Sequence, residues 1–121
     1  MATQPSVIAI VVPCYNESAI LNNTAQVLSG QLDKMSSCGL TAESSMVLFV
    51  DDRSTDGTWQ IIEKLHSKAP ERFLGIRLAA NRGHQAALLA GLMEARGFAE
   101  AVISMDADLQ DDVNVLPEFV E

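Results

Sequence analysis

The sequence predicts an α/β fold in which an open, mostly parallel β-sheet carries helices on both faces. Four short apolar runs are predicted to be strands, at residues 7–12, 46–50, 73–78 and 101–105. Each run is aliphatic or β-branched at nearly every position, which is typical of parallel strands covered on both faces. Three helical stretches separate the runs. Right-handed crossovers in this βαβαβαβ order place helices on both sides of the sheet.

The three helices are predicted from their apolar spacing and their boundary residues. The first is expected from about Ser18 to Lys34. The second begins after Gly57, and the third begins near Gly83 and ends near Gly97, since glycine is common just past helix C-termini. The apolar positions that define the last two are Trp59, Ile61, Ile62 and Leu65, and then Leu88, Leu92 and Ala95.

Composition limits the classes of partner. The 121 residues are 48% hydrophobic and carry a net charge of −8, as expected for one acidic globular domain. Nucleic acid is an unsuitable partner because phosphate neutralisation needs clustered Lys and Arg, whereas a nucleotide can bind through a cation. No secretory signal or membrane-length apolar run occurs. Cys14 and Cys38 are too few for a disulfide framework or a zinc site and are expected to be free and mostly buried thiols.

Polar clusters follow all four predicted strands. In open α/β sheets, ligands bind beyond the carboxyl ends of the strands, where the strand order reverses. Turn chemistry alone is a poor explanation for a polar cluster at every strand end. The clusters are Pro13-Cys14-Tyr15-Asn16-Glu17, Asp51-Asp52-Arg53-Ser54, Asn81-Arg82-Gly83-His84-Gln85 and Asp106-Ala107-Asp108.

The last cluster continues as Asp106-Ala107-Asp108-Leu109-Gln110 and predicts a cation site. Residues two apart at a strand end point to one side, so two carboxylates and an amide oxygen converge. Such ligands suit Mg²⁺ or Mn²⁺, with phosphate oxygens completing the shell. The alternative is an acidic helix N-terminus, which needs only one Asp as a cap. An EF-hand is excluded, because its required Gly and Glu are Asp111 and Pro117 here.

The clusters after the first two strands suggest a nucleoside site. One carboxylate of Asp51-Asp52 is expected to face the cleft and accept hydrogen bonds from a base or a ribose. Residues 54–57 form a turn into a helix by themselves, which leaves both carboxylates for a ligand. Tyr15 could stack on a base and Glu17 could bind a ribose, although this segment also suits a helix start.

Other readings of the motifs are weaker. At residues 81–85, Gly83 suits a tight turn, and His84 is either a cap or a phosphate neighbour. Neither a G-x-G-x-x-G fingerprint, a Walker A motif nor a G-x-S-x-G elbow is present. A phosphoacceptor receiver domain also gathers acids around a cation, but its acidic pair would follow the first strand, where this chain has Pro13-Cys14-Tyr15.

Taken together, four motifs in order resemble the family 2 glycosyltransferases with the GT-A fold. The likeness is greatest to the polyprenyl-phosphate glycosyltransferases, the group of dolichyl-phosphate mannose synthase and the bactoprenol glucosyltransferases. The Gly83-His84-Gln85 step into an Ala-rich helix is more similar to the bacterial kind. The motifs are residues 11–17 (VVPCYNE), 50–58 (VDDRSTDGT), 81–85 (NRGHQ) and 106–111 (DADLQD).

The resemblance implies that residues 1–121 form the Rossmann-like, nucleotide-sugar-binding part of such a domain. Residues 116–121 look like a helix cut in its first turns, so we expect the chain to be truncated at its C-terminus. The implied nucleotide-sugar-binding residues are Pro13, Tyr15, Glu17, Asp52, Asp106, Ala107 and Asp108, with Val50 and Asp51 in support. The implied cation ligands are Asp106, Asp108 and Gln110.

The implied activity is transfer of a sugar, with inversion, from a UDP-glucose-like or GDP-mannose-like donor to a polyprenyl phosphate. The cation held by Asp106 and Asp108 would stabilise the leaving diphosphate, and an anionic acceptor needs little help from a base. We expect the acceptor site and any membrane segment beyond Glu121, and the protein in the cytoplasm or at the cytoplasmic face of a membrane. These residues alone would then be inactive. A non-catalytic nucleotide- or metal-binding module is the alternative.

Two departures from the family pattern concern the base pocket and the acceptor side. Arg53 stands where the family often has a small residue, and Asp112-Val113-Asn114 replaces a frequent Pro-Pro-Glu. An unfinished sheet edge is also compatible with a homo-oligomer.

Overall fold

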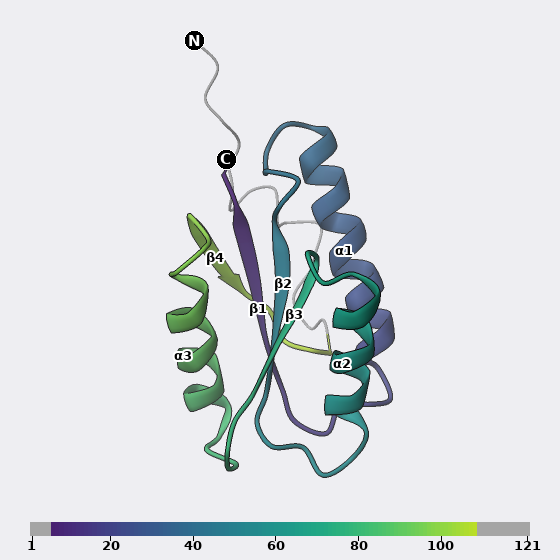
Figure 1. Ribbon diagram of the computed structural model, residues 1–121, viewed down its shortest axis with the longest axis vertical. Helices are drawn as coiled ribbons and strands as arrows, with labels where there is room; N and C mark the ends of the chain where they lie inside the picture. Colours follow the sequence, from purple (N-terminus) through teal and green to yellow (C-terminus); the bar gives the residue numbers. More distant parts are fainter. Residues whose placement is uncertain (1–5, 109–121) are drawn as a thin grey trace.

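The computed structural model describes residues 6–108, in which four strands alternate with three helices as predicted (Figure 1). The first helix begins three residues later than expected and ends three residues later, while the starts of the other two helices agree with the prediction. The elements are β1 (Ile8–Cys14), α1 (Leu21–Ser37), β2 (Met46–Asp51), α2 (Thr58–Lys68), β3 (Phe73–Arg77), α3 (His84–Ala95) and β4 (Ala101–Ser104).

The described strands form one parallel sheet in the order β3-β2-β1-β4. The chain therefore runs outward from β1 to β3 and then crosses back to place β4 on the other side of β1. All seven residues of β1 are buried, as are all six of β2. Because every pairing is parallel, the four carboxyl ends lie at one edge of the sheet, and the strand order reverses beside β1.

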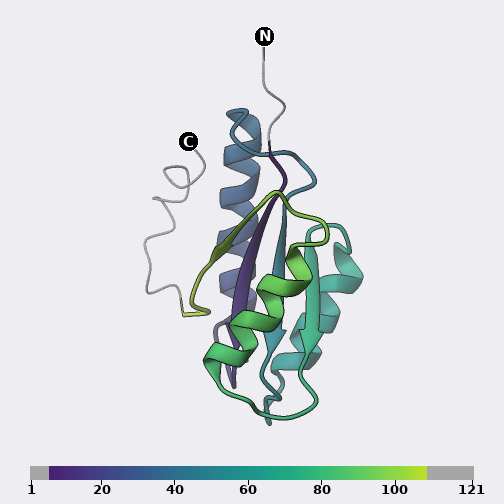
Figure 2. The ribbon, with the colours of Figure 1, turned by 90° about the vertical axis from the view of Figure 1, so that its left-hand side faces the viewer.

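Helices cover both faces of the sheet, as predicted. Figures 1 and 2 show α1 and α2 on one face and α3 on the other. The side chains of β1 alternate accordingly: Ile10 and Val12 belong to the apolar cluster under α1 and α2, whereas Ala9 and Val11 belong to the cluster under α3. The fold is thus a three-layer α/β/α arrangement around one sheet.

The expectation that all four strands are covered on both faces is wrong for the outer two. Gly75 and Arg77 of β3 are exposed, and so are Ala101 and Ser104 of β4. Both strands have a single strand neighbour within residues 6–108, so each is an edge strand there. Of the two thiols expected to be free and mostly buried, Cys14 is buried and Cys38 is exposed, and both are free.

None of the helices within the described part of the chain is long and apolar enough to cross a membrane.

Helix α3 approaches the sheet closely at Gly91. A Cβ atom placed there would lie 2.4 Å from Cγ1 of Val11 and 2.8 Å from Cγ2 of Val50. Both valines are 0% exposed and belong to the two central strands, so neither can move aside easily. Glycine at this position sets the distance between α3 and the sheet.

We therefore predict that Gly91→Ala destabilises the protein by about 1–3 kcal/mol, because the added methyl group overpacks the core. Alanine is the better helix former by about 1 kcal/mol, so a purely local effect would have the opposite sign. Gly30→Ala in α1 is the matched control, since no atom lies within 4 Å of a Cβ built there. Urea unfolding should show a lower midpoint for Gly91→Ala and an unchanged or higher one for Gly30→Ala. A stabilised Gly91→Ala variant would contradict the packing argument.

Candidate functional site

The polar segments that follow β1, β2, β3 and β4 meet at the carboxyl edge of the sheet. Backbone hydrogen bonds extend the strand pairing into these segments: the N–H of Asp52 donates to the carbonyl of Cys14 (2.8 Å), and that of Met105 donates to Val11 (3.0 Å). The N–H of Leu78 donates to Asp51 (2.9 Å). These hydrogen bonds fix the first residues of each loop relative to the sheet, and so also the directions of the side chains that follow.

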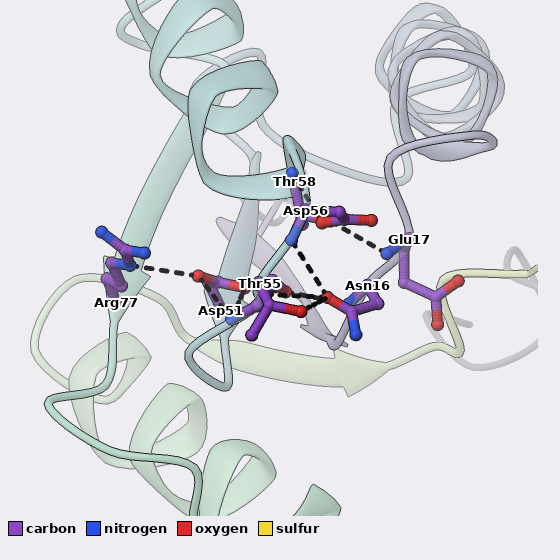
Figure 3. A network of polar contacts seen from close by, with 8 residues as sticks. Asn16, Glu17, Asp51, Thr55, Asp56, Thr58 and Arg77 are labelled. Atoms are coloured by element: carbon purple, nitrogen blue, oxygen red, sulfur yellow. Dashed lines mark hydrogen bonds and ion pairs between the residues drawn. The ribbon is translucent and has the colours of Figure 1, made fainter.

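Asn16 joins the loop after β1 to the loop after β2 (Figure 3). Its Oδ1 accepts hydrogen bonds from the backbone N–H groups of Thr55 (2.9 Å) and Asp56 (3.3 Å). Its own N–H donates to Oγ of Ser54 at 2.9 Å. Asn16 has a φ of +53°, a left-handed conformation that Asn tolerates better than most residues. The residue type thus fits both the turn and the cross-loop bonds.

Asp56 and Thr58 fix the backbone of Glu17 and Ser18, the two residues that follow Asn16. The N–H of Glu17 donates to Oγ1 of Thr58 (2.9 Å), and that of Ser18 donates to Oδ2 of Asp56 (3.3 Å). Oδ1 of Asp56 accepts from the N–H of Thr58 at 2.9 Å. Burial acts to raise the pKa of Asp56, but the hydrogen bonds from Thr58 and Ser18 outweigh it and lower that pKa to about 2. The Glu17 side chain points away from this network (Figure 3).

Asp51 is committed to the fold. Its carboxylate is 0% exposed, accepts hydrogen bonds from the N–H (3.2 Å) and the hydroxyl of Ser54, and forms an ion pair with Nε of Arg77 at 3.4 Å. The sequence-based interpretation is that residues 54–57 form their turn without hydrogen bonds to Asp51 or Asp52. This interpretation is wrong for Asp51, because Ser54 of the turn donates to its carboxylate. Val50 is also fully buried, and neither side chain lines the pocket beside them.

A pocket of about 360 Å³ opens between these loops, within the size range of small-molecule sites. It brings together four of the predicted residues, Pro13, Tyr15, Glu17 and Asp52. Tyr15 is 45% exposed, which leaves its ring available at the rim. The remaining lining residues are Cys14, Asn81, Gly83, His84 and Ala87. The sequence signal for Asn81, Gly83 and His84 was their place after the third strand, whereas Ala87 carries no local signal.

Asp52 fastens a neighbouring loop and can also accept a hydrogen bond from a further donor in this pocket. It is 4% exposed, and its oxygens accept hydrogen bonds from the N–H groups of Arg82 (2.8 Å) and Gly83 (2.9 Å). Gly83 has a φ of +93°, which favours glycine. The carboxylate thus fastens the loop between β3 and α3 and has lone pairs left for a further donor.

Cys14 is a poor nucleophile despite its place in the pocket wall. Burial raises the pKa of its thiol, and the negative charges of Asp51 and Glu17 raise that pKa further. The reactive thiolate form is therefore disfavoured.

Asp106 and Asp108 follow β4 at the same edge. Ala107 between them is 3% exposed, whereas Asp106 is half-buried and Asp108 is exposed. Burial raises the pKa of Glu17, and the negative charges of Asp108, Asp56 and Asp106 raise it further. Asp106 and Asp108 therefore create a negative potential beside Glu17, which fits the binding of a cation.

Only two of the three predicted cation ligands, Asp106 and Asp108, lie within the described residues. Gln110, the third predicted ligand, lies outside the described residues. Within residues 6–108, no three His, Cys, Asp or Glu side chains are grouped so as to hold a metal ion. The assignment of Asp106, Asp108 and Gln110 as ligands stays a prediction, and two carboxylates at a strand end are a suitable donor set for it.

Comparison with known proteins identifies the family. Residues 9–121 match the family described as "Glycosyl transferase family 2". The chain belongs to this family. The resemblance found in the four motifs is thereby confirmed, and the parallel sheet with its helices is the nucleotide-binding arrangement of GT-A glycosyltransferases.

Several curated proteins named as sugar transferases are similar over nearly the whole chain. An "Uncharacterized glycosyltransferase YkoT" of Bacillus subtilis is 46% identical over 118 residues, covering 98% of this chain and 34% of the relative. A "Dolichol-phosphate mannosyltransferase" of Pyrococcus furiosus is 32% identical (94% and 29% covered). An "Undecaprenyl-phosphate 4-deoxy-4-formamido-L-arabinose transferase" of Aeromonas hydrophila is 31% identical (98% and 34%). The chain therefore spans about a third of the length of these relatives.

Solved structures of other proteins contain a similar fold. The mannosyltransferase PcManGT of Pyrobaculum calidifontis, in complex with GDP-Man and Mn²⁺, superposes with a TM-score of 0.72 at 27% identity, covering 95% of this chain and 31% of that one. TarS of S. aureus, residues 1–349 in complex with UDP, gives a TM-score of 0.63 at 26% identity (84% and 27% covered).

We predict that Asp106→Asn lowers the pKa of Glu17 in the absence of metal, because one of the charges that disfavour its ionised form is removed. A carbon-detected NMR titration of the Glu17 carboxyl group would measure this. Asp33→Asn, a change to an exposed carboxylate of α1 that pairs with Arg72 (3.0 Å), should leave the Glu17 titration unchanged. An unaltered Glu17 titration in Asp106→Asn would show that the two carboxylates do not share a site.

Proposed function

We propose that the protein is a metal-dependent, inverting glycosyltransferase that binds a UDP- or GDP-linked sugar at the carboxyl edge of this sheet. The observation that carries the proposal is the pocket formed by Pro13, Tyr15, Glu17 and Asp52. It lies beside the negative potential of Asp106 and Asp108. A nucleoside diphosphate has an uncharged base and ribose at one end and an anionic diphosphate at the other. It therefore needs a nucleoside pocket next to a site that attracts a cation.

The nucleoside would occupy the pocket through stacking and hydrogen bonding. Tyr15 offers an exposed aromatic face at the rim, and Glu17 offers a carboxylate to a ribose hydroxyl. Within the pocket, the oxygens of the Asp52 carboxylate serve as hydrogen-bond acceptors. The carboxylate therefore suits a base whose ring nitrogen on the Watson–Crick edge carries a hydrogen, as N3 of uracil and N1 of guanine do. The corresponding ring nitrogens of cytosine and adenine are acceptors, although the amino groups beside them donate.

The diphosphate would be held through Mg²⁺ or Mn²⁺ bound by Asp106, Asp108 and Gln110, with Ala107 close to the donor. When bound, the cation stabilises the negative charge that develops on the leaving diphosphate. Asp106 and Asp108 thus serve catalysis by holding the charge-stabilising group. The complex of PcManGT with GDP-Man and Mn²⁺ supports this choice of donor and cation.

We propose a polyprenyl phosphate as the acceptor. The names of the Aeromonas and Pyrococcus relatives support it, since they refer to undecaprenyl phosphate and dolichol phosphate. A phosphate that is already anionic attacks the sugar without much help from a general base, so the carboxylates of this region can serve binding. A lipid acceptor also implies work at the cytoplasmic face of a membrane.

The first test is the metal dependence of nucleotide binding. Titration calorimetry should show that UDP or GDP binds with Mn²⁺ or Mg²⁺ present and that chelation abolishes this binding. Asp108→Asn should weaken the metal-supported affinity by at least about ten-fold, because even outer-shell partners of metal sites are worth that much. Glu43→Gln is the control, since this exposed carboxylate precedes β2 at the opposite edge of the sheet. Equal affinity after chelation would refute the role of the cation.

The second test is base selectivity. With Mn²⁺ present, UDP or GDP should bind at least about ten-fold more tightly than CDP and ADP, because an acceptor nitrogen that faces the Asp52 carboxylate loses its hydrogen bond to water and gains none in the pocket. Competition against a fluorescent nucleotide measures all four affinities under one condition. Tight CDP or ADP binding would show that the Asp52 carboxylate does not face the ring nitrogen of the base.

A further inference from the structure

We infer that Thr24 of α1 is a positioning residue for the Asp106–Asp108 segment. Its hydroxyl donates a hydrogen bond to the carbonyl oxygen of Ala107 at 2.5 Å, across 83 residues of sequence. The inference rests on the proposed function, in which Asp106 and Asp108 hold the cation. It assigns to a helix on one face of the sheet a part in setting the direction of two carboxylates at the sheet edge.

The covalent geometry makes this bond effective. The carbonyl carbon of Ala107 is bonded directly to the nitrogen of Asp108, and the atoms around that bond lie in one plane. Holding the oxygen therefore holds the plane from which the Asp108 residue extends. The preceding residue is fixed as well, because Met105 donates its N–H to Val11 at 3.0 Å. The segment carrying both carboxylates is thus fastened on either side of Asp106.

The surroundings make the bond hard to replace by water. Thr24 is 1% exposed and Ala107 is 3% exposed. Ala107 also belongs to the apolar cluster that includes Leu21 and Ala25 of α1. A buried carbonyl without a hydrogen-bond partner raises the free energy of the folded state, so the segment would shift to find another donor.

The residue type is informative in itself. In helices, a Thr hydroxyl commonly bonds to a carbonyl three or four residues earlier in the same helix. Thr24 directs its hydroxyl out of α1 to Ala107 instead. Packing alone would be served as well by valine, which has the same shape without a group that needs a partner. The hydroxyl therefore acts through Ala107.

The test compares Thr24→Val with the wild-type protein in the presence of Mn²⁺. Valine keeps the volume and removes the donor, so Mn²⁺ affinity, followed by electron paramagnetic resonance, should fall by about ten-fold. Mn²⁺-supported UDP or GDP affinity should fall with it. Thr24→Ser keeps the donor and should retain the Mn²⁺ affinity of the wild type, even where loss of the methyl group lowers stability.

Thr41 offers a matched control for the same substitution. It is also 1% exposed, and its hydroxyl oxygen has no hydrogen-bond partner among the described residues. Thr41 precedes β2, so it lies at the opposite edge of the sheet from Asp106 and Asp108. Thr41→Val should leave Mn²⁺ affinity unchanged. A general effect of burying valine would appear in both variants, whereas a positioning effect appears only at Thr24.

The outcomes separate this inference from the proposed function. Wild-type protein that binds nucleotide without regard to metal refutes the proposed cation site, and the inference with it. Wild-type protein that needs Mn²⁺, together with Thr24→Val that binds Mn²⁺ equally well, overturns the inference alone. If Thr24→Val does not fold, Thr24→Ser decides: retained Mn²⁺ affinity supports the role of the hydroxyl, and a folded Ser variant that has lost Mn²⁺ affinity overturns it.

Discussion

The parallel pairing of β1 with strands on both sides is the constraint on which the rest of this structure depends. β1 pairs with β2 through six residue pairs and with β4 through four, and every residue of β1 is buried. Parallel pairing brings segments that are far apart in the sequence to one edge of the sheet. The pocket between the loops after β1, β2 and β3, and the acidic pair after β4, exist because of this pairing. Helix packing then sets the distance between the helices and the sheet, as the close approach at Gly91 shows.

The acidic residues at this edge divide into two groups with opposite energetics. Asp51 and Asp56 are compensated within the fold, by Ser54 and Arg77 in one case and by Thr58 and Ser18 in the other. Glu17 has the opposite character, because burial and neighbouring carboxylates disfavour its ionised form. Charges that the fold does not compensate are available to a ligand, which is the usual trade between stability and function. The division separates Asp51 and Asp56, which serve the fold, from Glu17, while Asp52 both serves the fold and lines the pocket.

Much of this arrangement follows from local sequence, and the remainder depends on long-range contacts. The unbroken apolar runs at β1 and β2 predict buried strands, and the polar clusters after them predict the ligand edge. The exposure of Arg77 and Ser104 could not be predicted in this way, because an edge position is a property of strand order. Adjacent residues in an extended chain point to opposite faces, so different roles for Asp51 and Asp52 can be expected from the sequence. The ion-pair partner of Asp51 cannot, because Arg77 comes from the neighbouring strand β3. The bond from Thr24 to Ala107 has no local signal at all.

The double use of Asp52 restricts how this protein can diversify. The carboxylate that faces the pocket also secures the backbone of Arg82 and Gly83. Under the proposed function, a substitution there would remove a ligand contact and release a loop at the same time, so a loss of binding would not by itself demonstrate a lost contact. A change of ligand preference would therefore be more accessible through neighbours such as Tyr15, Asn81 and His84, which line the same pocket and for which the described residues show no such loop-fastening side-chain bonds. Within the pocket, an exposed residue such as Tyr15 is freer to vary than the buried Asp52.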